Sequence, residues 1–242
     1  MGTQLLILCG GKATRLRGIN GGVPKCLLRI DGKPILTHLI NNLGREFDRI
    51  TVSYAGSLEI YSSALADELK AGVANRLTFA HDEKQHGTAH AVQIHSDQAA
   101  ASVTVVNGDT IFSDYSGLLP DALGTDEIVL STSFQTVGRA GAVQQNIETG
   151  KIDFKKERDG GITQTNWVTN GLVTFGAAAL QRFCSQTVAK GVSLEAAVLS
   201  LQQCPELMFT LFEAKARFLD IGVPDDFTNA EMKYHEMATS KS

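Results

Sequence analysis

The feature that most constrains the fold is a short apolar run that ends in two glycines near the start of the chain. Residues 3–9 read Thr-Gln-Leu-Leu-Ile-Leu-Cys and are followed by Gly10 and Gly11. A continuous apolar run of this length predicts a strand buried on both faces, as in a parallel sheet covered by helices. Glycines directly after such a strand let backbone N–H groups turn toward a bound anion, because no side chain blocks the approach.

Short strands and helices alternate through the first half of the chain. A helix is predicted at 36–43, where four apolar residues follow the i, i+3, i+4, i+7 spacing of an amphipathic helix. Further strands are predicted at 49–55, 77–80 and 102–106, and further helices at 58–69 and 88–99. This rhythm predicts βαβ units and a doubly wound, mixed but mostly parallel α/β sheet.

The second half of the chain is richer in strands. Strands are predicted at 127–135, 151–154, 164–169, 172–175, 208–212 and 217–219. Helices are predicted at 177–184 and 193–201, and a last one after Pro224. No repeat, low-complexity linker or clear boundary divides the chain, so we expect a single domain over residues 1–242.

Charge and hydropathy exclude several classes of partner. The formal net charge is -4, from 22 basic and 26 acidic residues without a long basic run, so no broad nucleic-acid surface is expected. No segment approaches the roughly 18 apolar residues of a membrane span, and the start lacks a signal peptide's basic region. We therefore expect a soluble, cytoplasmic protein. The four cysteines are scattered without metal-ligand spacing, and Cys9, Cys26 and Cys184 are expected to be buried free thiols.

A resemblance to a known family rests on the segment from the first strand to residue 36. Residues 10–17 read Gly-Gly-Lys-Ala-Thr-Arg-Leu-Arg, and Pro-Lys at 24–25 and Gly-Lys-Pro at 32–34 follow. This segment resembles the G-G-x-G-T-R-L, P-K and G-K-P signature of sugar-phosphate nucleotidylyltransferases, in particular the D-glycero-D-manno-heptose 1-phosphate guanylyltransferases. Ala13 and Cys26 depart from the family's glycine and proline. The segment is neither a P-loop nor the G-x-G-x-x-G fingerprint of a nicotinamide-dependent enzyme.

The resemblance implies a Rossmann-like nucleotidyltransferase fold and a set of phosphate-binding residues. Arg15 and Lys25 are the expected catalytic residues, which would hold charge on the triphosphate and on the α-phosphate or sugar phosphate. The residues expected to bind the nucleotide are Leu8, Gly10, Gly11, Thr14, Asp82, Glu83, Gly87, Thr88 and Asp109. The alternative interpretation of the glycine-rich segment is a solvated turn with incidental charges.

A second match, His-Gly-Thr-Ala at 86–89, resembles the family's nucleobase pocket. Just upstream lie Asp82 and Glu83, where uridylyl-transferring relatives tend to carry glutamine. Guanine offers two adjacent donors, N1–H and the 2-amino group, which one carboxylate can accept together, whereas an acid would repel the acceptors of uracil. This favours GTP. An exposed acidic loop is the competing interpretation of these two residues.

Two aspartates resemble the family's metal-binding pair. Asp109 ends the run Val-Thr-Val-Val-Asn-Gly-Asp, and Asp220 opens Asp-Ile-Gly-Val-Pro. The resemblance implies that they hold Mg²⁺ between the phosphates of the two substrates, and two carboxylates plus phosphate oxygens and water suit that ion. For either aspartate alone, a turn or capping role is the default.

The expected sugar contacts are weaker matches. Glu157 and Arg158, in Phe-Lys-Lys-Glu-Arg at 154–158, resemble the family's F-x-E-K, with arginine in place of the lysine. Asn170 and Gly171 resemble the N-[AT]-G segment that contacts the sugar, although an Asn-Gly pair is equally typical of a hairpin turn. Gly108 is also expected at the sugar. Residues 1–112 would then form a nucleotide-binding half and residues 113–242 a sugar-binding half.

These patterns predict an enzyme of nucleotide-sugar biosynthesis that joins a nucleoside triphosphate, with GTP favoured, to a heptose or hexose 1-phosphate and releases pyrophosphate. No nucleophile pattern is readable, and direct transfer needs none. Two alternatives stay open: the same chemistry with UTP or dTTP and a hexose 1-phosphate, and a regulator that binds nucleotide sugars without turnover. The sequence also leaves the sugar and the oligomeric state open, a homo-oligomer included.

Overall fold

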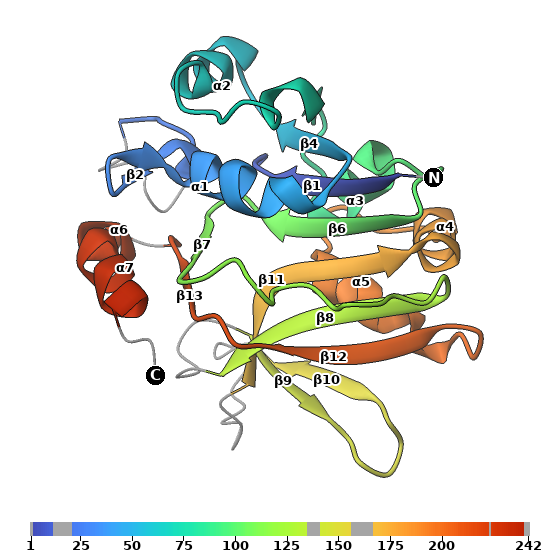
Figure 1. The fold of residues 1–242 in the computed structure, drawn as a ribbon. Helices are drawn as coiled ribbons and strands as arrows, with labels where there is room; N and C mark the ends of the chain where they lie inside the picture. Colours follow the sequence, from blue (N-terminus) through green and yellow to red (C-terminus); the bar gives the residue numbers. More distant parts are fainter. Residues whose placement is uncertain (1, 12–20, 135–140, 156–166, 223, 240–242) are drawn as a thin grey trace.

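A computed structural model describes residues 2–11, 21–134, 141–155, 167–222 and 224–239. One nine-stranded sheet runs through these residues (Figure 1). Its strands are β1 (Thr3–Leu8), β4 (Arg49–Tyr54), β5 (Leu77–His81), β6 (Ser102–Asn107), β8 (Glu127–Phe134), β9 (Ala142–Gln145), β10 (Ile152–Lys155), β11 (Trp167–Gly176) and β12 (Met208–Ala214). Two small sheets pair β2 (Arg29–Ile30) with β3 (Lys33–Pro34), and β7 (Thr110–Phe112) with β13 (Phe218–Asp220).

Helices cover the sheet and flank its edge. They are α1 (Ile35–Asn42), α2 (Leu58–Leu65), α3 (Thr88–His95), α4 (Ala177–Ser185), α5 (Leu194–Ser200), α6 (Pro224–Thr228) and α7 (Ala230–Thr239). Short 3-10 helices occupy Lys25–Leu27, Leu43–Glu46, Ala74–Arg76 and Leu201–Gln203. Among the residues described, no helix is both long and apolar enough to cross a membrane.

Strand direction confirms the predicted fold class. β1 pairs in parallel with β4 and with β6, and β4 pairs in parallel with β5. β11 runs antiparallel to both β6 and β8, and β12 is parallel to β8. The sheet is therefore mixed and mostly parallel. Because the carboxyl ends of β1, β4, β5 and β6 meet at one edge, the segments that follow these strands are brought together there.

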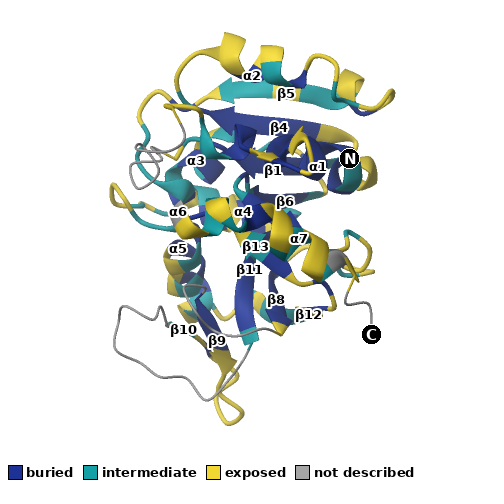
Figure 2. Ribbon diagram, turned by 90° about the vertical axis from the view of Figure 1, so that its left-hand side faces the viewer, coloured by how far each residue is buried: buried dark blue, intermediate teal, exposed yellow. Residues whose placement is uncertain are grey.

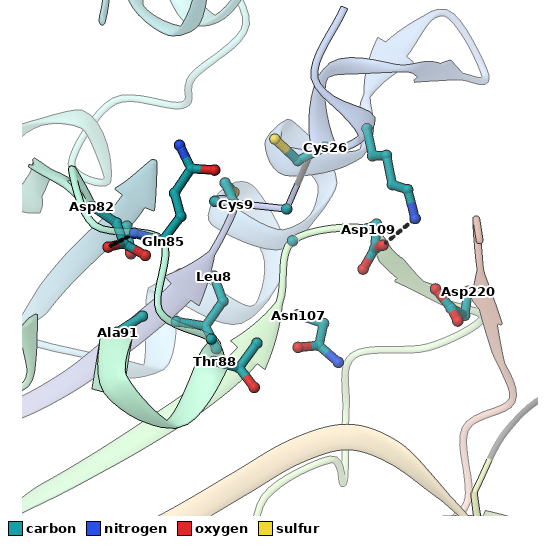
Figure 3. A pocket seen from close by; sticks show the side chains of 16 residues that line it. Leu8, Cys9, Cys26, Asp82, Gln85, Thr88, Ala91, Asn107, Asp109 and Asp220 are labelled. Atoms are coloured by element: carbon teal, nitrogen blue, oxygen red, sulfur yellow. Dashed lines mark hydrogen bonds and ion pairs between the residues drawn. The ribbon is translucent and has the colours of Figure 1, made fainter. Parts of the chain in front are cut away.

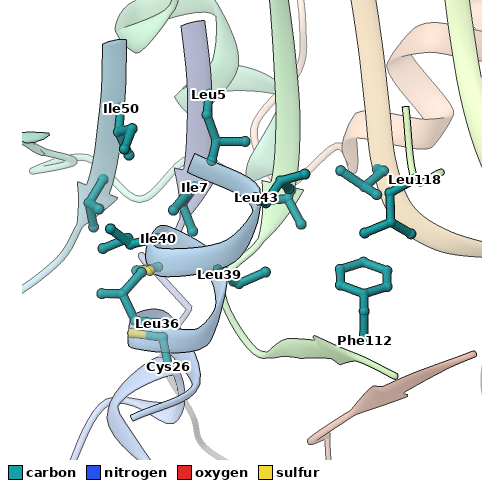
Figure 4. Close-up of a cluster of buried hydrophobic side chains, with 14 of the residues drawn as sticks. Leu5, Ile7, Cys26, Leu36, Leu39, Ile40, Leu43, Ile50, Phe112 and Leu118 are labelled. Atoms are coloured by element: carbon teal, nitrogen blue, oxygen red, sulfur yellow. The ribbon is translucent and has the colours of Figure 1, made fainter. Parts of the chain in front are cut away.

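Alternation along β1 builds a core on each face of the sheet. Leu5 and Ile7 are buried toward α1, where Leu39 packs against them in one apolar cluster (Figure 4). Leu6 and Leu8 point the other way, into the cluster formed with α3, α4 and α5. The central strands are accordingly buried along their length (Figure 2). Burial on both faces is what the continuous apolar run predicts.

The structure corrects the predicted break at Asn170–Gly171. These two residues are not a hairpin turn, because β11 is one continuous strand that passes through them. The pairing of β11 with β8 shifts register between Thr169 and Val173, and Gly171 has a φ of +82°. A bulge of this kind inserts an irregular residue without ending the strand. Four short strands, β2, β3, β7 and β9, were also missed by the sequence patterns.

Helices α2 and α3 end four residues earlier than predicted, and side-chain hydrogen bonds explain both ends. Asn41 donates to the Glu68 carbonyl at 2.7 Å and accepts from the Lys70 N–H at 2.8 Å, which fixes the chain after α2 in a non-helical path. After α3, Asp97 accepts from the Ala99 N–H at 3.0 Å, an Asx turn that competes with the helix. Of the three cysteines expected to be buried, Cys9 and Cys26 are, whereas Cys184 is half-buried.

Candidate functional site

A pocket of about 420 Å³ opens at the carboxyl edge of the parallel strands (Figure 3). The residues that line it are Leu8, Cys9, Gly10, Gly11, Lys25, Cys26, Ser53, Asp82, Gln85, Gly87, Thr88, Ala91, Asn107, Gly108, Asp109 and Asp220. Ten of them are among the site residues that the sequence predicted. They are Leu8, Gly10, Gly11, Lys25, Asp82, Gly87, Thr88, Gly108, Asp109 and Asp220. The fold therefore gathers segments that are far apart in the chain.

One end of the pocket carries a cation beside a carboxylate. Lys25 opens a 3-10 helix after Pro24, and its Nζ donates to Asp109 Oδ2 at 3.4 Å. Their side chains are only 20% and 25% exposed, so this ion pair is partly shielded from solvent. Gly10 and Gly11 also line the pocket, directly after β1. The expected partners Thr14 and Arg15 lie outside the described residues.

The two predicted metal-binding aspartates lie at the same pocket although 111 positions separate them in the sequence. Asp109 follows β6, and Asp220 ends β13, which pairs antiparallel with β7 so that Asp220 lies opposite Thr110. The Ile221 N–H donates to the Asp109 carbonyl at 3.1 Å and ties the two segments together. Within the described part of the chain, no group of three or more His, Cys, Asp or Glu side chains could hold a metal ion. Asp109 and Asp220 therefore supply two carboxylates, and a divalent cation held between them would need further oxygen ligands.

Packing explains why glycine occupies two of the predicted positions. The Gly108 N–H donates to the Leu8 carbonyl at 2.9 Å, and a Cβ at Gly108 would collide with Cys9 Sγ. Gly87 precedes α3 with a φ of +110°, and a Cβ there would lie 2.8 Å from the Val192 carbonyl oxygen. Both residues line the pocket, but the segments of the same chain that pack against them already leave no room for a side chain.

The other end of the pocket carries a single buried carboxylate. Asp82 follows β5, is 4% exposed, and accepts the Gln85 N–H through Oδ1 at 2.9 Å. Glu83 instead points outward: its side chain is 82% exposed, and it lies 4.0 Å from the His81 ring nitrogen. The structure thus separates the two acids, because Asp82 lines the pocket and Glu83 does not. Thr88 begins α3, and its Oγ1 accepts from the Leu194 N–H at 2.8 Å.

The predicted sugar residues divide between the pocket, the sheet and the undescribed part of the chain. Asn170 is 1% exposed, and its Nδ2 donates to Ser131 Oγ at 2.9 Å, so its carboxamide is used inside the sheet rather than in the pocket. Gly171 does not line the pocket but packs against Asn107, which does: a Cβ at Gly171 would lie 2.9 Å from Asn107 Nδ2. Glu157 and Arg158 lie outside the described residues.

A family model described as Nucleotidyl transferase matches residues 4–237. The chain belongs to this nucleotidyl transferase family. The match confirms the family that the glycine-rich segment indicated. The class of enzyme predicted from the sequence is confirmed with it.

Three relatives are informative. The UTP–glucose-1-phosphate uridylyltransferase AglF of Haloferax volcanii is 29% identical over 248 residues, covering 98% of each protein. A mannose-1-phosphate guanyltransferase beta-B of Xenopus laevis is 26% identical over 248 residues, covering 98% of this chain and 66% of that enzyme. The crystal structure of HddC from Yersinia pseudotuberculosis, complexed with GMP-PN, matches with a TM-score of 0.70 at 25% identity, covering 96% of this chain and 99% of that one.

Several residues that line the pocket of this nucleotidyl transferase were missed by the sequence patterns. They are Cys9, Cys26, Ser53, Gln85, Ala91 and Asn107. Asn107 could have been found, because it is the last residue of β6 and directly precedes Gly108–Asp109. Gln85 could not, since its position in the pocket depends on its own φ of +46°, which no local sequence pattern predicts.

Two weakly acidic groups at the end of β1, the Cys9 thiol and the hydroxyl of Tyr61 that contacts Cys9, have raised pKa values. Burial, and then the neighbouring Cys26 thiol, raises the pKa of Cys9 well above its ordinary value. Burial likewise raises the pKa of Tyr61, whose hydroxyl donates to the Cys9 carbonyl at 3.3 Å. Thiol and phenol are therefore neutral at physiological pH, and they do not compete with Lys25 and Asp109 for charged ligand groups.

Proposed function

We propose that this nucleotidyl transferase joins a nucleoside triphosphate to a sugar 1-phosphate, giving a nucleoside diphosphate sugar and pyrophosphate. The observation that carries the proposal is the single pocket in which Lys25, Asp109 and Asp220 meet the loop of Gly10–Gly11. Glycine backbone, ammonium and paired carboxylates are the groups that bind phosphates and their counter-cation. The names of AglF and of the Xenopus enzyme, which both act on sugar 1-phosphates, support the choice of acceptor.

The reaction is an in-line displacement at phosphorus. A phosphate oxygen of the sugar 1-phosphate attacks the α-phosphorus of the nucleotide, a new P–O bond forms, and the bond to the bridging oxygen breaks as pyrophosphate leaves with its electron pair. No protein nucleophile is required. The protein's contribution is positioning and charge neutralisation. Lys25 would hold the α-phosphate or the sugar phosphate, and Arg15 the triphosphate.

Asp109 and Asp220 would hold the divalent cation, which we propose is Mg²⁺. The donor set fits: two carboxylates from different segments face one pocket, and this cation is usually held by one or two carboxylates together with phosphate oxygens and water. When bound, the ion would neutralise negative charge on the phosphates. The ion pair between Lys25 and Asp109 also positions this carboxylate in the pocket.

GTP is the proposed nucleotide, with UTP or dTTP as the alternative. The preference is supported by Asp82, a buried carboxylate that lines the pocket at the end away from Lys25 and could accept from both N1–H and the 2-amino group of guanine. Relatives name both bases, since AglF is a uridylyltransferase and the Xenopus enzyme a guanyltransferase. Glu83 is exposed and outside the pocket lining, so it is not proposed to contact the base.

We further propose that residues 1–112 bind the nucleotide and residues 113–242 the sugar, as a heptose or hexose 1-phosphate. Fifteen of the residues that line the pocket come from the first half, and Asp220 enters from β13 in the second half. Gly171, against Asn107, marks where β11 of the second half approaches the pocket. Glu157 and Arg158 remain proposed sugar contacts.

The test is pyrophosphate release with each of GTP, UTP, dTTP, CTP and ATP against a panel of heptose and hexose 1-phosphates, with and without Mg²⁺. We expect metal-dependent release with GTP as the best nucleotide. A different best nucleotide would reject the role of Asp82 but keep the reaction. Binding of nucleotide sugars without release from any pair would favour a non-catalytic regulator instead.

A further inference from the structure

The turn between β5 and α3 holds an unusual backbone conformation at Gln85. Its φ is +46°, and it shares a positive φ with Asp31 alone among the described residues other than glycine. Left-handed backbone costs energy for a residue with a side chain, and such residues persist where surrounding contacts hold them, often at functional sites. Here the holding contact is the Gln85 N–H, which donates to Asp82 Oδ1 at 2.9 Å.

The turn decides which side chains reach the pocket. Asp82 and Gln85 both line it, whereas Glu83 between them is 82% exposed. Figure 3 shows the Gln85 side chain extending from this turn with its carboxamide at the free end, while the dashed contact to Asp82 comes from its backbone. Among the described residues, the Gln85 carboxamide has no hydrogen-bond partner. It is therefore available to a ligand.

Asp82 and Gln85 together present a defined set of donors and acceptors. Asp82 uses Oδ1 for the Gln85 N–H, and Oδ2 lies beside Gly10, where a Cβ would come within 3.5 Å of it. A carboxylate only accepts, whereas a carboxamide adds two N–H donors beside its carbonyl. An acceptor next to a donor complements a base edge that carries N–H groups beside a carbonyl oxygen.

We propose that Gln85 is a specificity-determining residue that donates from Nε2 to O6 of guanine, while Asp82 accepts from N1–H and the 2-amino group. The inference rests on the proposed function and adds to it the residue that reads O6. Cytosine and adenine place an amino group where guanine has O6, and uracil lacks the second donor that Asp82 would accept. Guanine is the base that satisfies both side chains.

Two substitutions separate this role from a structural one. Gln85→Gly removes the carboxamide and suits a positive φ better than glutamine does, so the turn and its bond to Asp82 Oδ1 are kept. Gln85→Glu keeps the length but places a second acceptor opposite O6. The matched control is Asp31→Gly, which relieves the same backbone conformation at φ +53° and lies outside the pocket lining.

The measurement is kcat/KM for each variant with three nucleotides: GTP, inosine triphosphate and 2-aminopurine riboside triphosphate. The inosine nucleotide keeps O6 and N1–H but lacks the 2-amino group. The 2-aminopurine nucleotide lacks O6. Loss of one hydrogen bond predicts a fall of roughly tenfold for Gln85→Gly with GTP and with the inosine nucleotide alike. Gln85→Glu is expected to lose more. With 2-aminopurine nucleotide Gln85→Gly is expected to be no worse than wild type, and Asp31→Gly is expected to change none of the three values.

An equal loss by Gln85→Gly on all three nucleotides would overturn the proposal, because the residue would then only shape the turn. A wild-type enzyme that works with UTP in preference to GTP would overturn it as well. If wild type releases no pyrophosphate from any pair, the proposed function fails, and calorimetric binding of the same three nucleotides then decides the role of Gln85 by the same pattern of losses.

Discussion

At the scale of single residues, Lys25 and Asp109 form the partly buried ion pair on which phosphate binding is proposed to depend. Asp109→Asn keeps the shape but removes the negative charge, and with it a proposed ligand of the cation. We expect kcat/KM to fall by about 10²–10³-fold, the cost typical of one charge-stabilising group in an active site. Steady-state kinetics at saturating Mg²⁺ measures this. The matched control is Asp153→Asn, at an exposed position of β10, and its activity should equal that of wild type. If Asp109→Asn were also as active as wild type, the assignment of Asp109 would be rejected.

Gly108 makes a different prediction at the same scale, because its role is packing. Gly108→Ala would drive a Cβ into Cys9 Sγ and to 3.0 Å from the Leu8 carbonyl oxygen. Overpacking of this kind costs about 1–3 kcal/mol, which urea denaturation would show as a lower free energy of unfolding. Cys9→Ala removes the colliding sulfur, so the double variant should lose less stability than the sum of the two single variants. Strict additivity would mean that the collision is relieved elsewhere.

At the scale of elements, the bulge in β11 places Gly171 against Asn107. Gly171→Ala pays for a Cβ at φ +82° and for a contact of 2.9 Å with Asn107 Nδ2. Gly150→Ala, at φ +68° in the β9–β10 turn with nothing within 4 Å, has the same backbone strain without the contact. Gly150→Ala should lose about 1 kcal/mol of unfolding free energy and Gly171→Ala more, because of the added contact, but only Gly171→Ala should raise KM for the sugar 1-phosphate. An equal KM in both variants would separate β11 from sugar binding.

His95, the last residue of α3, is expected to make the stability of the protein depend on pH. Burial lowers the pKa of His95 below the ordinary histidine value of 6.5, although Asp82 acts to raise it and His90 and His81 to lower it. The unfolded chain therefore binds a proton near pH 6.5 that the folded chain binds only at lower pH. The free energy of unfolding should fall as pH decreases from 6.5 toward the folded-state pKa, and rise with pH across the same window.

Urea titrations between pH 7.5 and 5 measure this slope. His95→Leu should show a shallower slope than wild type in that window, because it has no imidazole to charge. His235→Gln removes an exposed imidazole, 61% accessible beside Asp31, and is the matched control. An unchanged slope in His95→Leu would assign the acid sensitivity to another group.

At the scale of the whole molecule, the parallel half of the sheet was predictable because its signals are local. The apolar run of β1 and the helical spacing of α1 each report burial directly. The bulge at Asn170–Gly171 was not predictable, since the same dipeptide suits a hairpin turn and only pairing with β8 distinguishes the two. The site could likewise be predicted only where the sequence signal is local. Asp82 and Glu83 are adjacent in sequence, and which one faces the pocket depends on the turn at Gln85.

The pocket also joins both halves of the chain, which leads to a prediction about the molecule as a unit. Asp109 comes from the first half and Asp220 from the second, and the bond from Ile221 N–H to the Asp109 carbonyl already links them. A ligand that binds only the folded state stabilises it by about 2.7 kcal/mol at a concentration 100 times its Kd. Nucleotide with Mg²⁺ should therefore protect the segments around β7 and β13 together in hydrogen exchange. Asp220→Asn should weaken the protection at β13 while leaving intact that of the turn at Asp82, which we propose binds the base. Protection confined to the first half in wild type would show that the second half does not close the nucleotide site.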